Sequence, residues 1–292
     1  MTKPIKKSIK SAIALSAVAV LGLAGCAESS SEPLVIGSQA YYSNEIVAEV
    51  YAQVLEDAGY SVDRQFALGQ RDVYVPALLA GEIDIFPEYT GNLLQYFDPE
   101  ATATAEEDVY QALQAALPAG LTALALSGAS DQDSYNVTSD FAMKNSLTSI
   151  GDLAGVTGIR LGGAPELAER PYGPTGLLSS YGVTVEFEAT GDTTVESLVA
   201  GLIDMANVYS ADPRIQQLGL VTLTDPQGLF LSSNLVPIAS DAVNEEARDL
   251  ISAVSSAMTA ADLVALNVRS VDEQLSSAVI ARDWLLSKGL ID

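Results

Sequence analysis

A pattern that occurs twice in the chain is the feature that most restricts its fold. Residues 78–90 and 198–210 share the pattern L-x-A-G-x-I-D-x-x-x-x-Y-[S/T], so equivalent positions differ by 120. Each copy predicts a helix that stops at a glycine and then a strand that ends in a tyrosine, Tyr89 or Tyr209. Ligands of open α/β sheets bind outside the carboxyl ends of the strands. If the copies lie in opposite halves, these tyrosines face each other across a cleft; the alternative, that they only cap their sheets, stays open.

Short apolar runs alternate with amphipathic stretches along the rest of the chain. This alternation predicts an α/β fold with two lobes, each built on a mostly parallel sheet flanked by helices. Ser43 is expected to cap the first helix, and residues 243–290 are expected to be helical. The expected strands span residues 34–37, 61–66, 83–86, 121–126, 159–162, 183–187 and 205–209. The expected helices span residues 45–58, 73–80, 106–117, 149–153, 167–181 and 195–200, and the helix at 167–181 is expected to be interrupted by Pro171 and Pro174.

The residue types that are missing exclude several kinds of chemistry. The chain has no histidine and a single cysteine, Cys26, so a Ser-His-Asp triad, a Cys-His pair and an ordinary zinc site are all excluded. Only carboxylates are left for an enzyme, and neither a metal nor a cofactor is expected. The net charge of −24 argues against nucleic acid as a partner, because nucleic-acid binding requires many Lys and Arg side chains.

The amino-terminal residues have the features of a signal peptide. Four lysines lie among the first ten residues, and an apolar run over residues 12–23 is too short to span a bilayer comfortably. The run ends in Leu-Ala-Gly-Cys at residues 23–26, which resembles a bacterial lipobox. We therefore expect residues 1–25 to be a signal peptide, Cys26 to carry a lipid anchor, and residues 26–33 to form a tether. A plain signal peptide with a chance cysteine is the alternative.

Several short motifs together resemble the glycine betaine/choline-binding proteins of osmoprotectant ABC importers. The resemblance covers residues 34–290, and its most specific parts are Pro-Glu-Tyr-Thr-Gly at residues 87–91 and Tyr-Ser-Ala-Asp at residues 209–212. Further matches are Gly-Ser-Gln at residues 37–39, Leu-Glu-Asp-Ala-Gly-Tyr at residues 55–60 and Asn-Leu-Val-Pro at residues 234–237. The resemblance implies a binding protein without catalysis that captures choline or glycine betaine.

The same resemblance implies a two-lobed periplasmic-binding-protein fold of the second type, with the ligand cleft between the lobes. We expect lobe one at residues 34–132 plus 238–292 and lobe two at residues 133–237. The chain would cross between the lobes near residues 131–137 and 232–237. Such a protein is expected to be a monomer that closes around its ligand by a hinge motion and docks on a membrane permease.

Members of this family hold a quaternary ammonium group in a box of tyrosine rings. Such a group has no N–H donor, so recognition depends on cation–π attraction. By the resemblance, Tyr89, Tyr135 and Tyr209 occupy three box positions. The fourth ring falls where this chain has Ser232 and Ser233. Three nearby tyrosines are candidate substitutes, namely Tyr41, Tyr42 and Tyr172.

On the side that would hold a betaine carboxylate, this chain departs from the family pattern. Gln39 stands where lysine is common, and Asn92 stands where threonine is common, whereas Arg170 remains as a cation for a charge-assisted hydrogen bond. Choline, which has a hydroxyl in place of the carboxylate, suits Gln39 and Asn92 at least as well. Asp72 has two possible roles. It could be a counter-charge near the ligand, but the favoured interpretation is a helix cap before Val73.

Two other functions compete with this interpretation. An anchored hydrolase could use two carboxylates, such as Glu88 with Asp212. A receptor of the same fold could instead bind another small solute, such as an amino acid or a polyamine.

Overall fold

The computed structural model describes Met1 and residues 32–292. The expected signal peptide, the lipobox with Cys26 and most of the expected tether lie outside the described residues. Within the part of the chain that is described, no helix is both long enough and apolar enough to span a bilayer.

The first sheet has five strands in the order β2-β1-β3-β10-β4. Strands β2, β1 and β3 are parallel, whereas β10 runs antiparallel to both of its neighbours, β3 and β4. Four strands therefore point one way, and β10 is reversed. The strands are β1 (Leu34–Gly37), β2 (Val62–Gln65), β3 (Ile85–Tyr89), β4 (Leu121–Ala123) and β10 (Leu235–Ser240).

The second sheet repeats this arrangement, with the order β7-β6-β8-β5-β9. Here β7, β6 and β8 are parallel, and β5 is the reversed strand between β8 and β9. The strands are β5 (Asp133–Val137), β6 (Ile159–Gly163), β7 (Val185–Ala189), β8 (Met205–Tyr209) and β9 (Val221–Thr222). The prediction of two mostly parallel sheets flanked by helices is confirmed.

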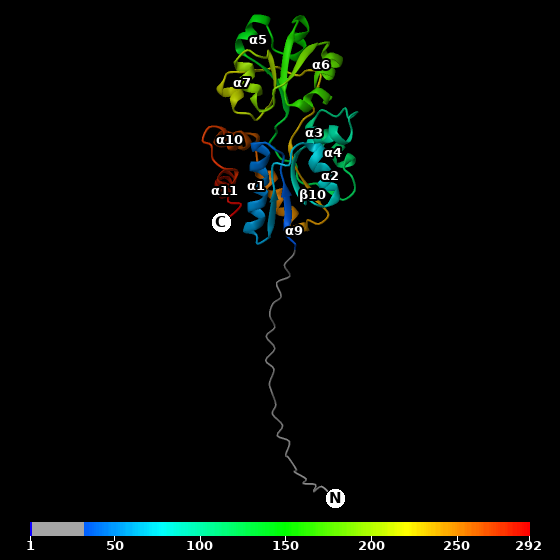
Figure 1. Ribbon diagram of the computed structural model, residues 1–292, viewed down its shortest axis with the longest axis vertical. Helices are drawn as coiled ribbons and strands as arrows, with labels where there is room; N and C mark the ends of the chain where they lie inside the picture. The colour runs from blue at the N-terminus through cyan, green and yellow to red at the C-terminus, as the bar shows by residue number, and fades with distance from the viewer. Residues whose placement is uncertain (2–31) are drawn as a thin grey trace. The chain divides into compact units, whose positions relative to one another are not determined.

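Helices cover both faces of the first sheet (Figure 1). Because side chains alternate between the faces of a strand, Ile85 joins the core under α1 while its neighbour Phe86 joins the core under α2, α3 and α4. On the α1 side, α9, α10 and α11 pack against α1. The helices are α1 (Tyr42–Asp57), α2 (Arg71–Ala80), α3 (Thr90–Phe97), α4 (Glu106–Ala116), α9 (Glu245–Ala257), α10 (Ala260–Val271) and α11 (Ser277–Lys288).

Shorter helical segments flank the second sheet. Met205 of β8 packs in a core with α6, and the next residue, Ala206, packs in a smaller core with α7. The α-helices are α5 (Ser139–Asn145), α6 (Pro174–Tyr181), α7 (Thr194–Val199) and α8 (Arg214–Gln217). The 3₁₀ segments are η1 (Ile150–Gly155), η2 (Pro165–Glu169) and η3 (Gly191–Thr193).

The interruption predicted at Pro171 and Pro174 is confirmed: the segment is divided into η2 and α6, because Pro171 lacks an N–H group and disfavours helical backbone just before it. Two other local predictions were wrong. Ser43 does not cap α1, which begins one residue earlier behind Tyr41. Asp72 lies inside the first turn of α2 and does not cap it.

The repeated sequence pattern corresponds to a repeated structure. Just after α2 and α7, Gly81 and Gly201 adopt φ values of 72° and 71°. Asp84 then accepts a hydrogen bond from the backbone N–H of Val35 at 2.9 Å, and Asp204 accepts the equivalent bond from Arg160 at 3.0 Å. The first half of the pattern therefore ends a helix and fastens the following strand to its parallel neighbour.

The shared backbone conformation predicts that both glycines are equally sensitive to alanine. Gly81→Ala and Gly201→Ala should each lower the free energy of unfolding by about 1 kcal/mol, because an L-residue is strained at positive φ. No atom lies within 4 Å of either added Cβ, so strain is the only expected cost. Denaturant unfolding measures the loss. Gly155→Ala is the matched control, since Gly155 is equally open but has no positive φ; equal stability of all three variants would contradict the explanation.

Candidate ligand-binding site

The two tyrosines of the repeated pattern occupy equivalent places in the two sheets. Tyr89 is the last residue of β3 and pairs with Leu235 at the start of the reversed strand β10. Tyr209 is the last residue of β8 and pairs with Asp133 at the start of the reversed strand β5. Each tyrosine therefore lies at the carboxyl end of a central strand, beside the point where the chain enters the sheet.

Tyr41 completes an aromatic cluster with these two residues. It lies just before α1, and its ring stacks on that of Tyr209 with 5.6 Å between the centroids and 17° between the planes. Burial raises the pKa of Tyr41 well above its ordinary value, and Tyr89, Asp131 and Tyr209 add to that shift. Burial is also the largest cause that raises the pKa of Tyr89 and of Tyr209, although Tyr209 remains 37% exposed, so all three phenols are neutral. We call Tyr41, Tyr89 and Tyr209 the tyrosine cluster.

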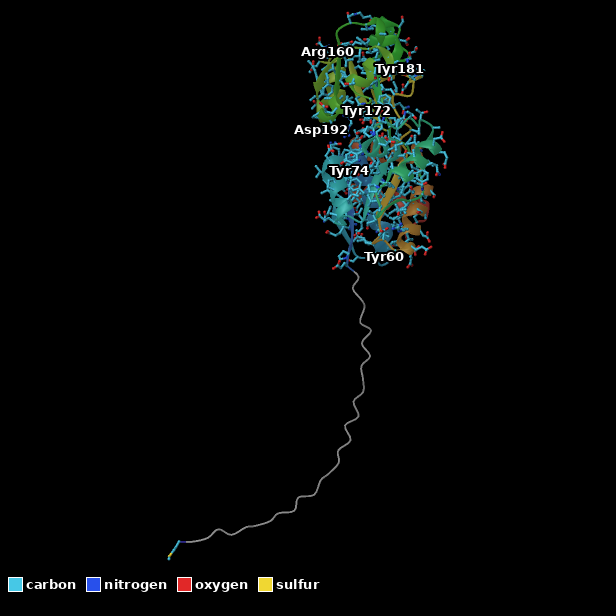
Figure 2. The ribbon with its side chains drawn as sticks, turned by 90° about the vertical axis from the view of Figure 1, so that its right-hand side faces the viewer. Tyr60, Tyr74, Arg160, Tyr172, Tyr181 and Asp192 are labelled. Atoms are coloured by element: carbon cyan, nitrogen blue, oxygen red, sulfur yellow. The ribbon has the colours of Figure 1, made fainter. Side chains whose placement is uncertain are left out.

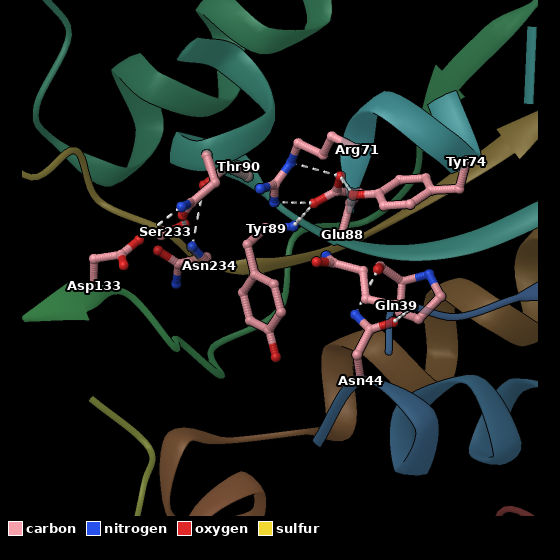
Figure 3. Close-up of polar contacts among 12 residues, drawn as sticks. Gln39, Asn44, Arg71, Tyr74, Glu88, Tyr89, Thr90, Asp133, Ser233 and Asn234 are labelled. Atoms are coloured by element: carbon pink, nitrogen blue, oxygen red, sulfur yellow. Dashed lines mark hydrogen bonds and ion pairs between the residues drawn. The ribbon is translucent and has the colours of Figure 1, made fainter. Parts of the chain in front are cut away.

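A buried ion pair lies directly behind Tyr89 (Figure 3). Glu88 binds Arg71 through two hydrogen bonds of 3.0 and 2.7 Å, and it also accepts hydrogen bonds from the Tyr74 hydroxyl and the backbone N–H of Tyr89. Burial of Arg71 disfavours its charge, but Glu88 outweighs this effect and holds the pKa of Arg71 above its ordinary value. Sequence reasoning missed Arg71, although its position just ahead of the repeated pattern was a signal.

The residues expected on the carboxylate side have different surroundings. The backbone N–H of Gln39 donates to Asn44 at 2.8 Å, whereas the Gln39 side-chain amide makes no hydrogen bond to any described residue. Asn92 is fully engaged: it donates to Asp133 at 2.8 Å and to the Tyr172 hydroxyl at 3.1 Å, and it accepts from Ser233 at 2.7 Å. Asn92 therefore bonds the first half of the molecule to the second, where Tyr172 lies (Figure 2).

Arg170 and Tyr172 lie together after η2. Arg170 is half-buried, and its guanidinium forms no ion pair with any residue of 32–292. Its charge lowers the pKa of both Tyr172 and Tyr209 against the opposing effect of burial, which is larger. A cation without a partner therefore faces the side of the cluster where Tyr209 and Tyr172 lie.

Tyr135 and Tyr42 lie apart from the stacked rings. Tyr135 is fully buried in the core of the second sheet, where it packs against Phe230 and donates to the Tyr172 carbonyl at 2.5 Å. Tyr42 is partly buried. Its burial is the main cause that raises its pKa, and the negative charge of Asp212 is the second. The structure therefore brings Tyr89, Tyr209 and Tyr41 together and places Tyr135 behind Tyr172.

Comparison with known proteins decides the family. Residues 32–287 match the family described as the substrate binding domain of ABC-type glycine betaine transport systems. The chain belongs to this family. It is 28% identical over 280 residues to the glycine betaine-binding protein YehZ of Escherichia coli, covering 89% of this chain and 92% of that protein. The ergothioneine transport permease/binding protein EgtU of Helicobacter pylori is 23% identical over 277 residues, which cover 89% of this chain and 48% of that protein.

Solved structures of relatives have the same fold. A structure described as a glycine betaine/carnitine/choline ABC transporter has a TM-score of 0.72 at 22% identity, covering 89% of this chain and all of that one. The expected periplasmic-binding-protein fold of the second type is confirmed. As a substrate-binding protein of an ABC importer, this chain acts outside the cytoplasm and serves a permease.

Family membership also confirms that the protein is not an enzyme. The hydrolase alternative is wrong, and the structure gives the reason. Glu88 is held by Arg71, and Asp212 is held by Arg214 through hydrogen bonds as short as 2.6 Å. A carboxylate that is saturated by a guanidinium is a poor proton acceptor or nucleophile.

The buried ion pair should be the more costly of two pairs to break. Glu88→Gln should lower the free energy of unfolding by about 3 kcal/mol, because it leaves the Arg71 charge buried without a counter-ion. The control is Glu273→Gln, which breaks an exposed pair with Arg269 and should cost less than about 1 kcal/mol. Denaturant unfolding compares the two variants; a loss for Glu88→Gln no larger than the control would refute the role given to the pair.

Proposed function

We propose that this receptor captures a quaternary ammonium osmoprotectant, choline or glycine betaine, at the tyrosine cluster and delivers it to its permease. The observation that carries the proposal is the convergence of three neutral tyrosines on one place. Two of them come from equivalent strand ends of the two sheets, and Tyr41 stacks on one of these. The relatives named for glycine betaine support the choice of ligand.

Cation–π attraction explains why the rings suit this ligand. A trimethylammonium group cannot donate a hydrogen bond from nitrogen, but a desolvated ring face attracts it by about 2 kcal/mol. Tyr41 takes the place of the fourth family ring, which is absent at Ser232 and Ser233. Tyr135 was expected in the box; because its hydroxyl holds the Tyr172 carbonyl, we assign it a positioning role behind Tyr172.

The other end of the ligand would meet side chains that form no hydrogen bond or ion pair with the described residues. Arg170 is suited to a betaine carboxylate, and the free side-chain amide of Gln39 is suited to either a hydroxyl or a carboxylate. Asn92, in contrast, is occupied by Asp133, Tyr172 and Ser233, so we assign it to joining the two halves.

Ligand capture would involve movement of the two lobes. We place lobe one at residues 34–132 plus 238–292 and lobe two at residues 133–237. The reversed strands β5 and β10 follow the two crossings, and hinge closure about those crossings would enclose the ligand between the strand ends. The protein would act as a monomer until the closed form docks on the permease.

Attachment to the membrane fits this role. We propose that residues 1–25 are removed as a signal peptide and that Cys26 then carries a lipid. A receptor held at the surface keeps a high local concentration near its permease.

A second candidate is a receptor for a different small solute on the same fold, for instance an amino acid or polyamine. The match to EgtU supports this candidate. EgtU is named for ergothioneine and YehZ for glycine betaine, so relatives of this chain are named for different ligands.

Loss of a cluster ring should weaken ligand binding. Tyr89→Ala and Tyr209→Ala should each reduce the affinity for choline or glycine betaine about 30-fold, the equivalent of about 2 kcal/mol for one ring. Isothermal titration calorimetry of the purified protein against choline, glycine betaine, carnitine, proline and spermidine measures both the affinity and the choice of ligand.

Two control variants distinguish the loss of an aromatic ring at the site from a general loss of protein stability. Tyr209→Phe keeps the ring and should retain most of the affinity, and Tyr60→Ala removes a tyrosine whose hydroxyl bonds to Asn244 instead. Choline or betaine binding that survives both alanine changes in the cluster would end the aromatic-cage proposal. Binding of only proline or spermidine would favour the second candidate.

If Cys26 carries the lipid, attachment of the protein to the membrane depends on the Cys26 sulfur atom. Cys26→Ser removes the only thiol of the chain, so it should abolish incorporation of a labelled fatty acid and release the protein from the membrane fraction. Expression in a bacterial host followed by labelling and fractionation measures both effects. Ser29→Ala is the control and should change neither; a Cys26→Ser protein that stays labelled would rule out this anchor.

A further inference from the structure

Asp131 is a buried acid to which no role was assigned from the sequence. It lies on the first crossing between the halves, where its backbone N–H donates to the Ser233 carbonyl on the second crossing at 3.1 Å. Its side chain is 3% exposed. The residue is therefore enclosed at the point where both crossings run side by side.

Only half of the Asp131 carboxylate is used within the protein. Oδ1 accepts a hydrogen bond from the backbone N–H of Ala211 at 2.8 Å, whereas Oδ2 has no hydrogen-bond or ion-pair partner in residues 32–292. Oδ2 is not among the fully covered polar atoms without a partner, so this oxygen is open to contact with a ligand.

The surroundings of Asp131 are aromatic and acidic. Its charge acts on all three rings of the tyrosine cluster and on Tyr42, which come from the start of α1 and from the ends of β3 and β8. Asp133 of β5 and Asp212 after β8 are the acidic neighbours. Of the nearby cations, Arg71 is bound by Glu88 and Arg214 by Asp212. Residues 32–292 therefore leave the Asp131 charge without a counter-ion.

The surroundings of Asp131 disfavour its ionised form. Burial is the largest cause, Asp133 and Asp212 act in the same direction, and the Ala211 N–H opposes them; together they raise the pKa of Asp131 to about 7. Near neutral pH, protonated and ionised forms are then both populated. A cation placed among the tyrosines would stabilise the ionised form and displace the proton.

We propose that Asp131 is the counter-charge for the cationic head group and makes the receptor prefer a net cation, such as choline, to a zwitterion, such as glycine betaine. This inference rests on the proposed function and deepens it. Asp131 and Asp133 have no ion-pair partner in the described chain, and Arg170 is the neighbouring cation that also lacks one. A net cation neutralises the remaining negative charge, whereas a zwitterion brings a carboxylate toward it.

The test is calorimetry of choline and glycine betaine with three proteins at pH 6 and pH 8. For wild type, the choline affinity should rise about tenfold between these pH values, because the ionised fraction of a group with a pKa near 7 rises about tenfold. Asp131→Asn keeps the oxygen that accepts from Ala211 but carries no charge. It should bind choline about tenfold more weakly at pH 8, bind betaine at most about threefold more weakly, and lose most of the pH dependence. Asp63→Asn, a change on the exposed face of β2, should behave as wild type.

A second measurement needs no variant. Titration of choline into wild type at pH 7 in buffers of different ionisation enthalpy should show release of about half a proton per ligand, since about half of the acid is protonated at its pKa. No proton release, an unchanged choline affinity in Asp131→Asn, or an equal loss for both ligands would each overturn the inference and leave the proposed function standing. If wild type binds neither choline nor glycine betaine, the proposed function fails first, and the inference fails with it.

Discussion

Antiparallel pairing of the two reversed strands controls the geometry of the whole site. β5 and β10 follow the crossings between the halves, and each enters its sheet beside the central strand that ends in a tyrosine. Because side chains alternate along a strand, a slip of one residue would turn Tyr89 or Tyr209 to the opposite face. The same pairing places Asp131, two residues before β5, next to the tyrosine cluster.

The charged residues near the cluster have two different roles: some stabilise the fold through ion pairs, and others are available to bind the ligand. Glu88 and Asp212 are paired with Arg71 and Arg214 from their own half of the chain, so their main role is to hold the backbone behind the cluster. Asp131 and Arg170, in contrast, form no ion pair with any residue of 32–292. A buried charge without a partner is costly, and it is tolerated where a ligand supplies the missing charge. Recognition would then depend on Asp131 and Arg170, two charged residues near the cluster that have no ion-pair partner within residues 32–292.

Prediction from the sequence succeeded where the signal is local. Periodic apolar residues located most strands and helices, and the repeated pattern located both tyrosines at strand ends. Prediction also located the break in a helix at Pro171 and Pro174, but it failed at the caps of α1 and α2, where Ser43 and Asp72 were expected. It also missed Arg71, since an arginine at a helix start reads as an exposed residue until its partner Glu88, seventeen positions later, packs over it.

The sequence by itself determined the α/β class, the two equivalent strand-end tyrosines, the family and the absence of histidine chemistry, because each depends on residue identity or short-range periodicity. Only the tertiary structure decided which side chains meet. It stacked Tyr41 on Tyr209, placed Tyr135 in a core and enclosed Asp131 among rings from three elements. These contacts join residues far apart in the chain. The burial of these side chains, and the electrostatic field that acts on them, arise only after the sheets have packed. No local sequence pattern therefore encodes them.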